Sequence, residues 1–191
     1  MNSRGGDMPS GTPSEVPSEV PKNVSANTAP HAHATLRERH RAAMGQALDA
    51  AREAASVGEV PVGAVVLDAR GQVLAIARNR REELTDPLSH AEVEAMRAAA
   101  RARGDWKMED CTLVVTLEPC PMCAGAAVSA HMGRVVFGAW DEKMGALGSV
   151  WDIARDPHDG FAPEVYGGVH AEECAQLLRE FFAPRRGQSF L

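Results

Sequence analysis

The sequence predicts an α/β fold in which helices cover a mixed β-sheet. The apolar run 62–67 and the strand-like run 72–77 flank the turn Asp68-Ala69-Arg70-Gly71, an arrangement typical of a β-hairpin. After the hairpin, segments with helical and strand periodicity alternate along the chain. A hairpin pairs its strands antiparallel, whereas strands joined by helical crossovers pair parallel. We therefore expect both kinds of pairing in one sheet.

The remaining elements follow from the spacing of apolar residues. A first helix is expected over 37–55, where small and apolar residues recur on one face, and a last helix from near His170. Between them, after the hairpin, we expect helix 89–103, strand 112–116, helix 121–131 and strand 135–138.

Residues 1–35 differ in composition from the rest of the chain. They are mostly Ser, Pro, Gly and Ala, include the repeat Pro13-Ser-Glu-Val-Pro-Ser-Glu-Val-Pro21, and contain almost no aromatic or branched apolar residues. Such a segment cannot offset its ordering entropy by burial. We expect a disordered leader at 1–35 and one domain at 36–191.

Composition limits the class of protein. No apolar run approaches the roughly 20 residues that cross a bilayer, and the N-terminus lacks the apolar core of a secretory signal. We therefore expect a cytoplasmic protein that does not enter membranes. The net charge of −6 provides no global basic surface for nucleic acid. Arginines gather at 78–81, 97–103 and 179–186, where either solvated faces or a local nucleic-acid footprint would explain them.

Two short segments concentrate the chemistry. They are Ser89-His90-Ala91-Glu92 and Glu118-Pro119-Cys120-Pro121-Met122-Cys123, each at the start of an expected helix. Pro121 suits the first helical position, so the helix is expected to begin at the two cysteines. Helix N-termini favour anionic groups, so two thiolates are stabilised there. Thiolates with an imidazole select zinc, and we expect His90, Cys120 and Cys123 to hold one zinc ion per chain.

The number of ligands indicates catalysis. Structural zinc sites usually have four protein ligands, whereas catalytic sites leave the fourth position to water. Glu92 lies beside the three ligands in sequence and suits proton transfer better than ligation. Helix periodicity does not explain how His90 and Glu92 share a site, because residues two apart lie about 160° apart around the axis.

Each piece also has a simpler explanation. Ser89 with Glu92 is a capping-box pattern, and Cys120 with Cys123 could be a redox pair or half of a zinc ribbon. Cys111 could be a fourth, structural ligand. Cys111 and Cys174 are most simply small buried residues. The joint pattern H-x-E followed by P-C-x-x-C matches the zinc-deaminase signature and favours the catalytic hypothesis.

At these residues the chain resembles the cytidine/deoxycytidylate deaminase superfamily, and within it the bacterial tRNA-specific adenosine deaminases. The resemblance covers roughly residues 37–186. Its superfamily-wide parts are His90-Ala91-Glu92 and Pro119-Cys120-Pro121-Met122-Cys123. The run from Gly138 to Ser149, with Asp141 and Lys143, is the part that resembles the tRNA-specific enzymes.

The resemblance implies a three-layer α/β/α cytidine-deaminase-like fold with a central five-stranded mixed sheet, assembled as a homodimer. It implies hydrolytic deamination of the wobble adenosine of a tRNA anticodon to inosine, by zinc-activated water with Glu92 as the proton shuttle. Asn79 would touch the flipped nucleoside, and Asp141 and Lys143 would lie by the anticodon loop. Without the resemblance, Asn79 and Asp141 would be interpreted as turn or cap residues.

The sequence leaves two other functions open. One is deamination of a free base or nucleoside such as guanine or cytosine, and the other is a structural zinc module. The chain also departs from the family pattern at Gly160-Phe161-Ala162, at Ala130-His131 and at Trp140. These departures lie outside the predicted zinc ligands and bear on contacts to RNA.

Overall fold

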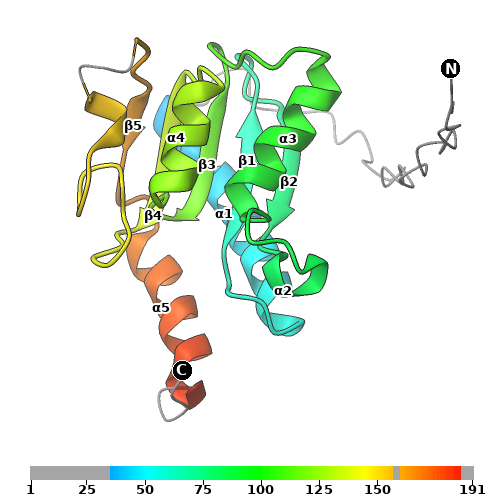
Figure 1. The fold of residues 1–191 in the computed structure, drawn as a ribbon, viewed down its shortest axis with the longest axis vertical. Coiled ribbons are helices and arrows are strands. Elements are labelled where there is room, and N and C mark those ends of the chain that lie inside the picture. The colour runs from blue at the N-terminus through cyan, green and yellow to red at the C-terminus, as the bar shows by residue number, and fades with distance from the viewer. Residues whose placement is uncertain (1–34, 157–159, 186–191) are drawn as a thin grey trace, which may run out of the picture. The chain divides into compact units, whose positions relative to one another are not determined.

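Five strands form one sheet in the order β2-β1-β3-β4-β5 (Figure 1). The computed structural model describes residues 35–156 and 160–185. The strands are β1 (Gly63–Leu67), β2 (Val73–Arg78), β3 (Thr112–Leu117), β4 (Arg134–Ala139) and β5 (Glu164–Tyr166). The helices are α1 (Leu36–Ser56), α2 (Arg81–Leu84), α3 (Ala91–Arg103), α4 (Pro121–Ser129) and α5 (Ala171–Phe182), with 3₁₀ turns at Ile153–Arg155 and Ala183–Arg185.

The sheet is mixed, as the sequence predicted. β1 pairs antiparallel with both β2 and β3, whereas β3 with β4 and β4 with β5 pair parallel. The parallel strands β3 and β4 are joined by α4. Their carboxyl ends therefore meet at one edge of the sheet, where α/β proteins commonly place their ligand sites.

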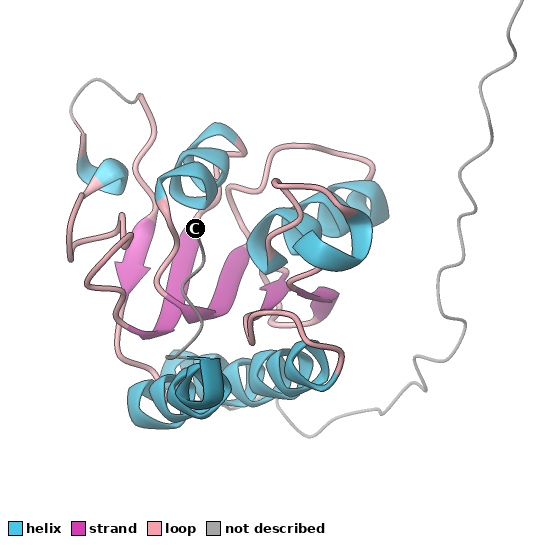
Figure 2. Ribbon diagram, turned by 60° about the horizontal axis from the view of Figure 1, so that its bottom comes forward, coloured by secondary structure: helices cyan, strands magenta, loops and turns pink. Residues whose placement is uncertain are grey.

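Helices cover both faces of the sheet, as Figure 2 shows. Alternate residues of the central strands point to opposite sides, because the side-chain period of a strand is two. Leu113, Val115 and Phe137 enter the core shared with α3 and α4. Val114 and Val136 enter the core shared with α1 and α5. Both faces of these strands are thus buried, which explains their nearly continuous apolar sequence.

The helix ends have local causes. Thr35 caps α1 with a capping box, in which its hydroxyl accepts from the Glu38 amide and the Glu38 carboxylate accepts from the Thr35 amide. α3 ends at Gly104, whose left-handed backbone favours glycine. α4 begins after Cys120, with proline at its first position.

The expected elements are present within one or two residues of their predicted bounds, and α2 and β5 are additional. No helix among the described residues is long and apolar enough to cross a membrane. The predicted leader lies outside the described residues except for Thr35, and its disorder and the domain boundary stay predictions.

Candidate active site

His90, Cys120 and Cys123 come together where α3 and α4 begin. His90 is the N-cap of α3 and Cys120 the N-cap of α4. His90 Nδ1 lies 3.7 Å from Cys120 Sγ and 3.5 Å from Cys123 Sγ. The three ligand atoms all lie within 4.8 Å of one another, and no other such group occurs among the described residues. The predicted trio can therefore hold a metal ion.

The donor set suits zinc. Two sulfurs and one imidazole nitrogen are soft and borderline ligands that zinc prefers over calcium or magnesium. Hydrogen bonds from the Cys123 thiol and from His90 lower the pKa of Cys120 to about 4. The hydrogen bond that Cys123 donates to Cys120, together with burial, raises the pKa of Cys123. One thiolate thus forms readily, and a divalent cation between the sulfurs would favour the second.

Glu92 is buried beside this trio. Only 4% of its surface is exposed, and burial raises the pKa of its carboxyl group. His90 has extended backbone angles, φ −74° and ψ 151°, so it stands outside the helical rotation. The helical angle between residues two apart therefore does not apply, and His90 and Glu92 face the same site.

The capping-box explanation for Ser89 and Glu92 is wrong. The Ser89 hydroxyl lies within hydrogen-bond distance of the carboxylates of Asp86 and Glu94. α3 is capped by His90 and has no capping hydrogen bond from a side chain. The burial of Glu92 is consequently not explained by helix initiation.

The other two cysteines lie elsewhere. Arg103 Nη1 lies 3.1 Å from Cys111 Sγ, and Cys174 Sγ packs 3.9 Å from Met44 Sδ. Both cysteines are buried, and burial raises the pKa of Cys111 to about 11 and that of Cys174 to about 12. They are small buried residues, as the simplest explanation held, and Cys111 is not part of the trio.

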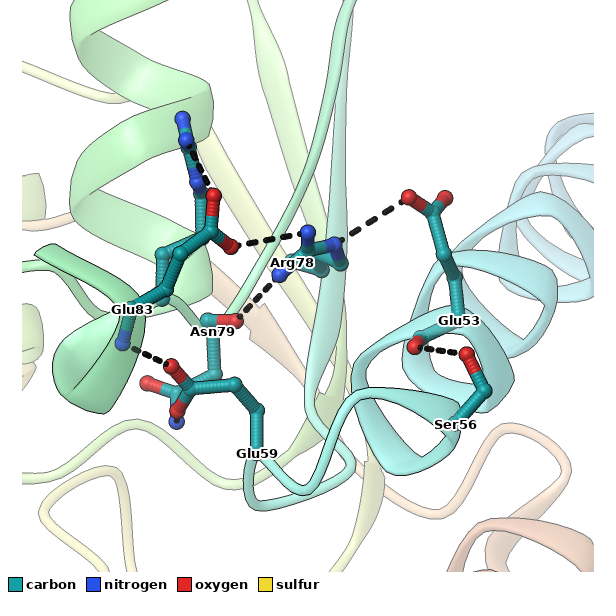
Figure 3. Close-up of polar contacts among 7 residues, drawn as sticks. Glu53, Ser56, Glu59, Arg78, Asn79 and Glu83 are labelled. Carbon is teal, nitrogen blue, oxygen red and sulfur yellow. Dashed lines mark hydrogen bonds and ion pairs between the residues drawn. The ribbon is translucent and has the colours of Figure 1, made fainter.

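Asn79 is buried at the end of β2 and held by Glu59 (Figure 3). Asn79 Nδ2 donates to Glu59 Oε2 at 2.9 Å, and the Glu83 amide donates to Glu59 Oε1 at 2.8 Å. A carboxylate only accepts, so the Asn79 amide must turn its NH₂ group toward Glu59 and its oxygen away. The next residue, Arg80, bonds through its amide to the Ser89 carbonyl, so Asn79 lies close in the chain to a segment fixed beside His90.

The arginine clusters are largely engaged in ion pairs. Arg78 pairs with Glu83, as Figure 3 shows. Arg80 also pairs with Glu83, and its hydrogen bond lowers the pKa of Glu83 to about 2. Arg97 pairs with Glu94, and Arg103 with Asp110. These contacts favour the solvated-face interpretation. Of Arg185 and Arg186, the side chains lie outside the part of the chain that the structure describes.

Asp141 and Lys143 lie on a loop, residues 140–149, that is braced by the buried carboxylate of Glu118. Glu118 Oε2 accepts from the Asp141 amide at 3.1 Å. Glu118 Oε1 accepts from the amides of Leu147 and Ser149, at 3.0 and 3.1 Å. The loop is thus fixed to the segment that leads into Cys120.

Two further contacts hold residues 140–149 against the segment before Cys120. A Cβ on Gly145 would lie 2.3 Å from Glu118 Oε2, so only glycine lets the loop approach the carboxylate. The Ala146 amide also donates to the Pro119 carbonyl at 2.9 Å. Asp141 Oδ1 accepts from the amides of Lys143 and Met144, so it is a turn residue here, while Lys143 is exposed.

Replacing Glu118 with glutamine should destabilise the protein without removing its metal. The amide NH₂ cannot accept a hydrogen bond, so at least one buried amide loses its partner, which costs about 1–3 kcal/mol. Thermal unfolding and zinc content measure this. Glu142→Gln is the matched control, an exposed acid on the same loop. Equal stability of the two variants would contradict the bracing role.

Two of the three segments that depart from the family pattern, Ala130-His131 and Gly160-Phe161-Ala162, meet at the end of α4 that is far from Cys120. The His131 ring stacks on Phe161 with centroids 4.8 Å apart, and the Trp106 ring contacts His131 edge-on at 5.5 Å. α4 has 9 residues and so spans about 13 Å. This stack is therefore separated from Cys120 by the length of the helix. Trp140, the third departure, directly precedes Asp141.

Comparison with known families agrees with this geometry. Residues 37–139 match the family model described as the cytidine and deoxycytidylate deaminase zinc-binding region. The chain belongs to this deaminase family. The matched segment contains the whole trio and Glu92, and the family's zinc-binding region fits one zinc per chain.

Two named relatives are similar to this chain over most of its length. The tRNA-specific adenosine deaminase of Bacillus subtilis is 42% identical over 143 residues, which cover 75% of this chain and 88% of that protein. A protein of Deinococcus radiodurans named tRNA(Ile)-lysidine synthase is 53% identical over 148 residues, which cover 78% of this chain. This chain therefore spans only 25% of the length of the Deinococcus radiodurans protein.

A solved structure from work on A-to-I editing by tRNA:A34 deaminases at the wobble position of transfer RNA has the same fold. It aligns with a TM-score of 0.70 and 41% identity, covering 72% of this chain and 99% of that chain. The cytidine-deaminase-like α/β fold and the resemblance to tRNA-specific adenosine deaminases are thereby confirmed.

Proposed function

We propose that this chain hydrolytically deaminates the wobble adenosine of a tRNA anticodon to inosine, with His90, Cys120 and Cys123 as zinc ligands. The observation that carries the chemistry is the buried Glu92 beside a trio of one histidine and two cysteines. A structural zinc module would have no use for a buried carboxyl group next to three ligands, since burying it costs stability.

Zinc bound by the trio would supply a Lewis acid that lowers the pKa of a water molecule toward neutrality. Glu92 takes the proton from the attacking water and delivers it to the purine ring. A C6–O bond forms, and Glu92 takes the second proton from the new C6 hydroxyl and passes it to the departing amino group as the C6–N bond breaks and the C6 carbonyl forms. The products are inosine and ammonia. The buried position of Glu92 beside the trio suits it to hold a proton between these steps.

The choice of substrate is supported by relatives such as the Bacillus subtilis tRNA-specific adenosine deaminase, of which the alignment covers 88%. It is also supported by the loop that carries Asp141 and Lys143. Asn79, turned by Glu59, would present its amide oxygen to a hydrogen-bond donor of the flipped nucleoside. Asp141 and Lys143 would contact the anticodon loop beside it. The proposal includes a homodimer and a cytoplasmic location, and size-exclusion chromatography with light scattering tests the first.

Glu59→Gln should weaken substrate recognition because a glutamine amide can face Asn79 with either end. Loss of one charge-assisted hydrogen bond, worth about 1.4 kcal/mol, corresponds to about a 10-fold fall in kcat/KM. Steady-state kinetics on an anticodon stem-loop measure it, with Glu53→Gln as control. Glu53 pairs with Arg78 in the same network but is exposed. Equal kinetics of the two variants would contradict the role of Glu59.

The substrate proposal is tested by assaying ammonia release from an anticodon stem-loop beside free adenosine, guanine and cytosine. We expect the stem-loop adenosine to react far faster than any free compound. Fast turnover of a free base, with none on the stem-loop, would instead support the alternative of a free-base or nucleoside deaminase. Zinc without any deamination would support a structural module.

A further inference from the structure

Large apolar side chains are exposed on residues 140–151, the segment between β4 and the 3₁₀ turn Ile153–Arg155. Trp140 is 52% exposed, and Met144, Val150 and Trp151 are each more than 40% exposed. Large apolar side chains exposed at four positions of one short segment mark a candidate binding site. We call these four residues the apolar rim.

The apolar rim adjoins the candidate active site. Trp140 directly follows β4, and its neighbour Asp141 is bonded to Glu118, two residues before Cys120. β3 and β4 are parallel, so the segment carrying Cys120 and the loop carrying Trp140 leave the same edge of the sheet. The trio and Trp140 therefore lie at the same edge of the sheet.

The Trp140 ring is held in place on its inner side. It meets the edge of Phe137 at 88°, with centroids 4.7 Å apart. A Cβ on Gly167 would lie 2.7 Å from Trp140 Cζ2, so the absence of a side chain there makes room for the ring. A rigid, half-exposed indole loses little conformational entropy when a ligand binds to it.

Charge favours stacking over phosphate contacts on this loop. Asp141 and Glu142 outnumber Lys143, and Asp141 already accepts two backbone hydrogen bonds. Ionic contacts alone would therefore give an RNA loop little affinity for this edge. Unpaired bases of RNA loops stack on aromatic side chains, an interaction that does not need cations.

We propose that Trp140 is a stacking platform for a nucleobase that neighbours the deaminated adenosine in the RNA loop. This rests on the proposed function, because it names a second contact to the same substrate. A free base would have no neighbouring base to stack, so the platform distinguishes an RNA substrate from a free one.

The test compares Trp140→Ala with Trp140→Phe and with the control Trp106→Ala. Trp106 is equally open, at 57% exposure, but it lies beyond the opposite end of α3 from His90. Trp140→Ala should raise both Kd and KM for the stem-loop by about 5- to 100-fold, with kcat nearly unchanged. Trp140→Phe should recover most of the loss, and Trp106→Ala should resemble the wild type. The ratio of the Kd of Trp140→Ala to the Kd of the wild type should stay the same at high salt, because salt does not screen stacking as it screens phosphate contacts.

Several results would overturn the platform. They are a wild-type KM in Trp140→Ala, equal losses in Trp140→Ala and Trp106→Ala, or a Trp140→Ala protein whose oligomeric state differs from that of the wild type. The last result would assign Trp140 to an interface between copies. Binding and inosine formation are measured separately. If the wild type binds the stem-loop in a Trp140-dependent way without forming inosine, the proposed function fails and the platform stands. If it forms inosine at equal KM with and without Trp140, only the platform fails. If the wild type neither binds nor deaminates the stem-loop, both fail.

Discussion

The Glu92→Ala variant is expected to lose at least about 1,000-fold in kcat while keeping its zinc and its fold. Glu92 is assigned both proton transfers, and positioned acid-base groups contribute typically 10²–10⁴-fold each. Its carboxyl group is buried with a raised pKa, so the fold gains little from its charge. The melting temperature should therefore stay level or rise. Single-turnover kinetics on the stem-loop, with metal analysis and thermal unfolding, measure the three quantities.

Glu92→Gln separates proton transfer from packing. The amide nearly preserves the shape of the side chain but cannot carry a proton, so the loss in kcat should be nearly as large. Retained turnover in either variant would remove Glu92 from the mechanism. Loss of zinc in both would show that Glu92 acts on the metal site and not on the substrate.

Cys120→Ala and Cys123→Ala are each expected to reduce zinc from about one per chain to near zero and to destabilise the fold. The two sulfurs and His90 join the starts of α3 and α4, so metal binding energy is also folding energy. A site holding metal at 1,000 times its Kd contributes about 4 kcal/mol. Metal analysis and denaturant unfolding measure both effects, and a chelator should give the wild-type protein the same stability as the variants.

Cys111→Ala is the matched control for metal loss, because Cys111 is a buried cysteine outside the trio. It should keep its zinc and its deaminase activity, with only the modest loss of stability expected for a small buried side chain. If Cys111→Ala removes zinc as completely as Cys120→Ala, the site has four protein ligands and the catalytic proposal loses its basis.

Local sequence patterns were sufficient for most of the fold. The hairpin turn and the alternation of helical and strand periods predicted eight of the elements because each has an apolar face of its own. β5 was not located, because Glu164–Tyr166 has only 3 residues and no buried side chain. It exists by pairing with β4, a contact between segments far apart in sequence. α2 is a single turn of 4 residues without a buried side chain, which leaves no periodic signal.

In the site too, residues with a local sequence signal were predicted, and residues that depend on partners from distant segments were not. His90, Cys120 and Cys123 were predicted because metal ligands have a distinctive composition and spacing. Glu59 and Glu118 were not, because a lone acidic residue usually lies on the surface, and both are buried here by partners from distant segments. For Glu118 one signal was available, since it directly follows the buried strand Thr112–Leu117. Helix periodicity could not place His90 with Glu92, because a cap residue does not follow the helical rotation.

Incubation of the wild-type protein with an anticodon stem-loop in oxygen-18 water tests hydrolytic deamination of the wobble adenosine. We expect that the adenosine at the wobble position becomes inosine, that one ammonia is released for each inosine, and that the new C6 oxygen comes from the solvent. Free adenosine, guanine and cytosine under the same conditions should react far more slowly. An unchanged stem-loop together with rapid deamination of a free base would contradict the assignment of this chain to tRNA adenosine deamination.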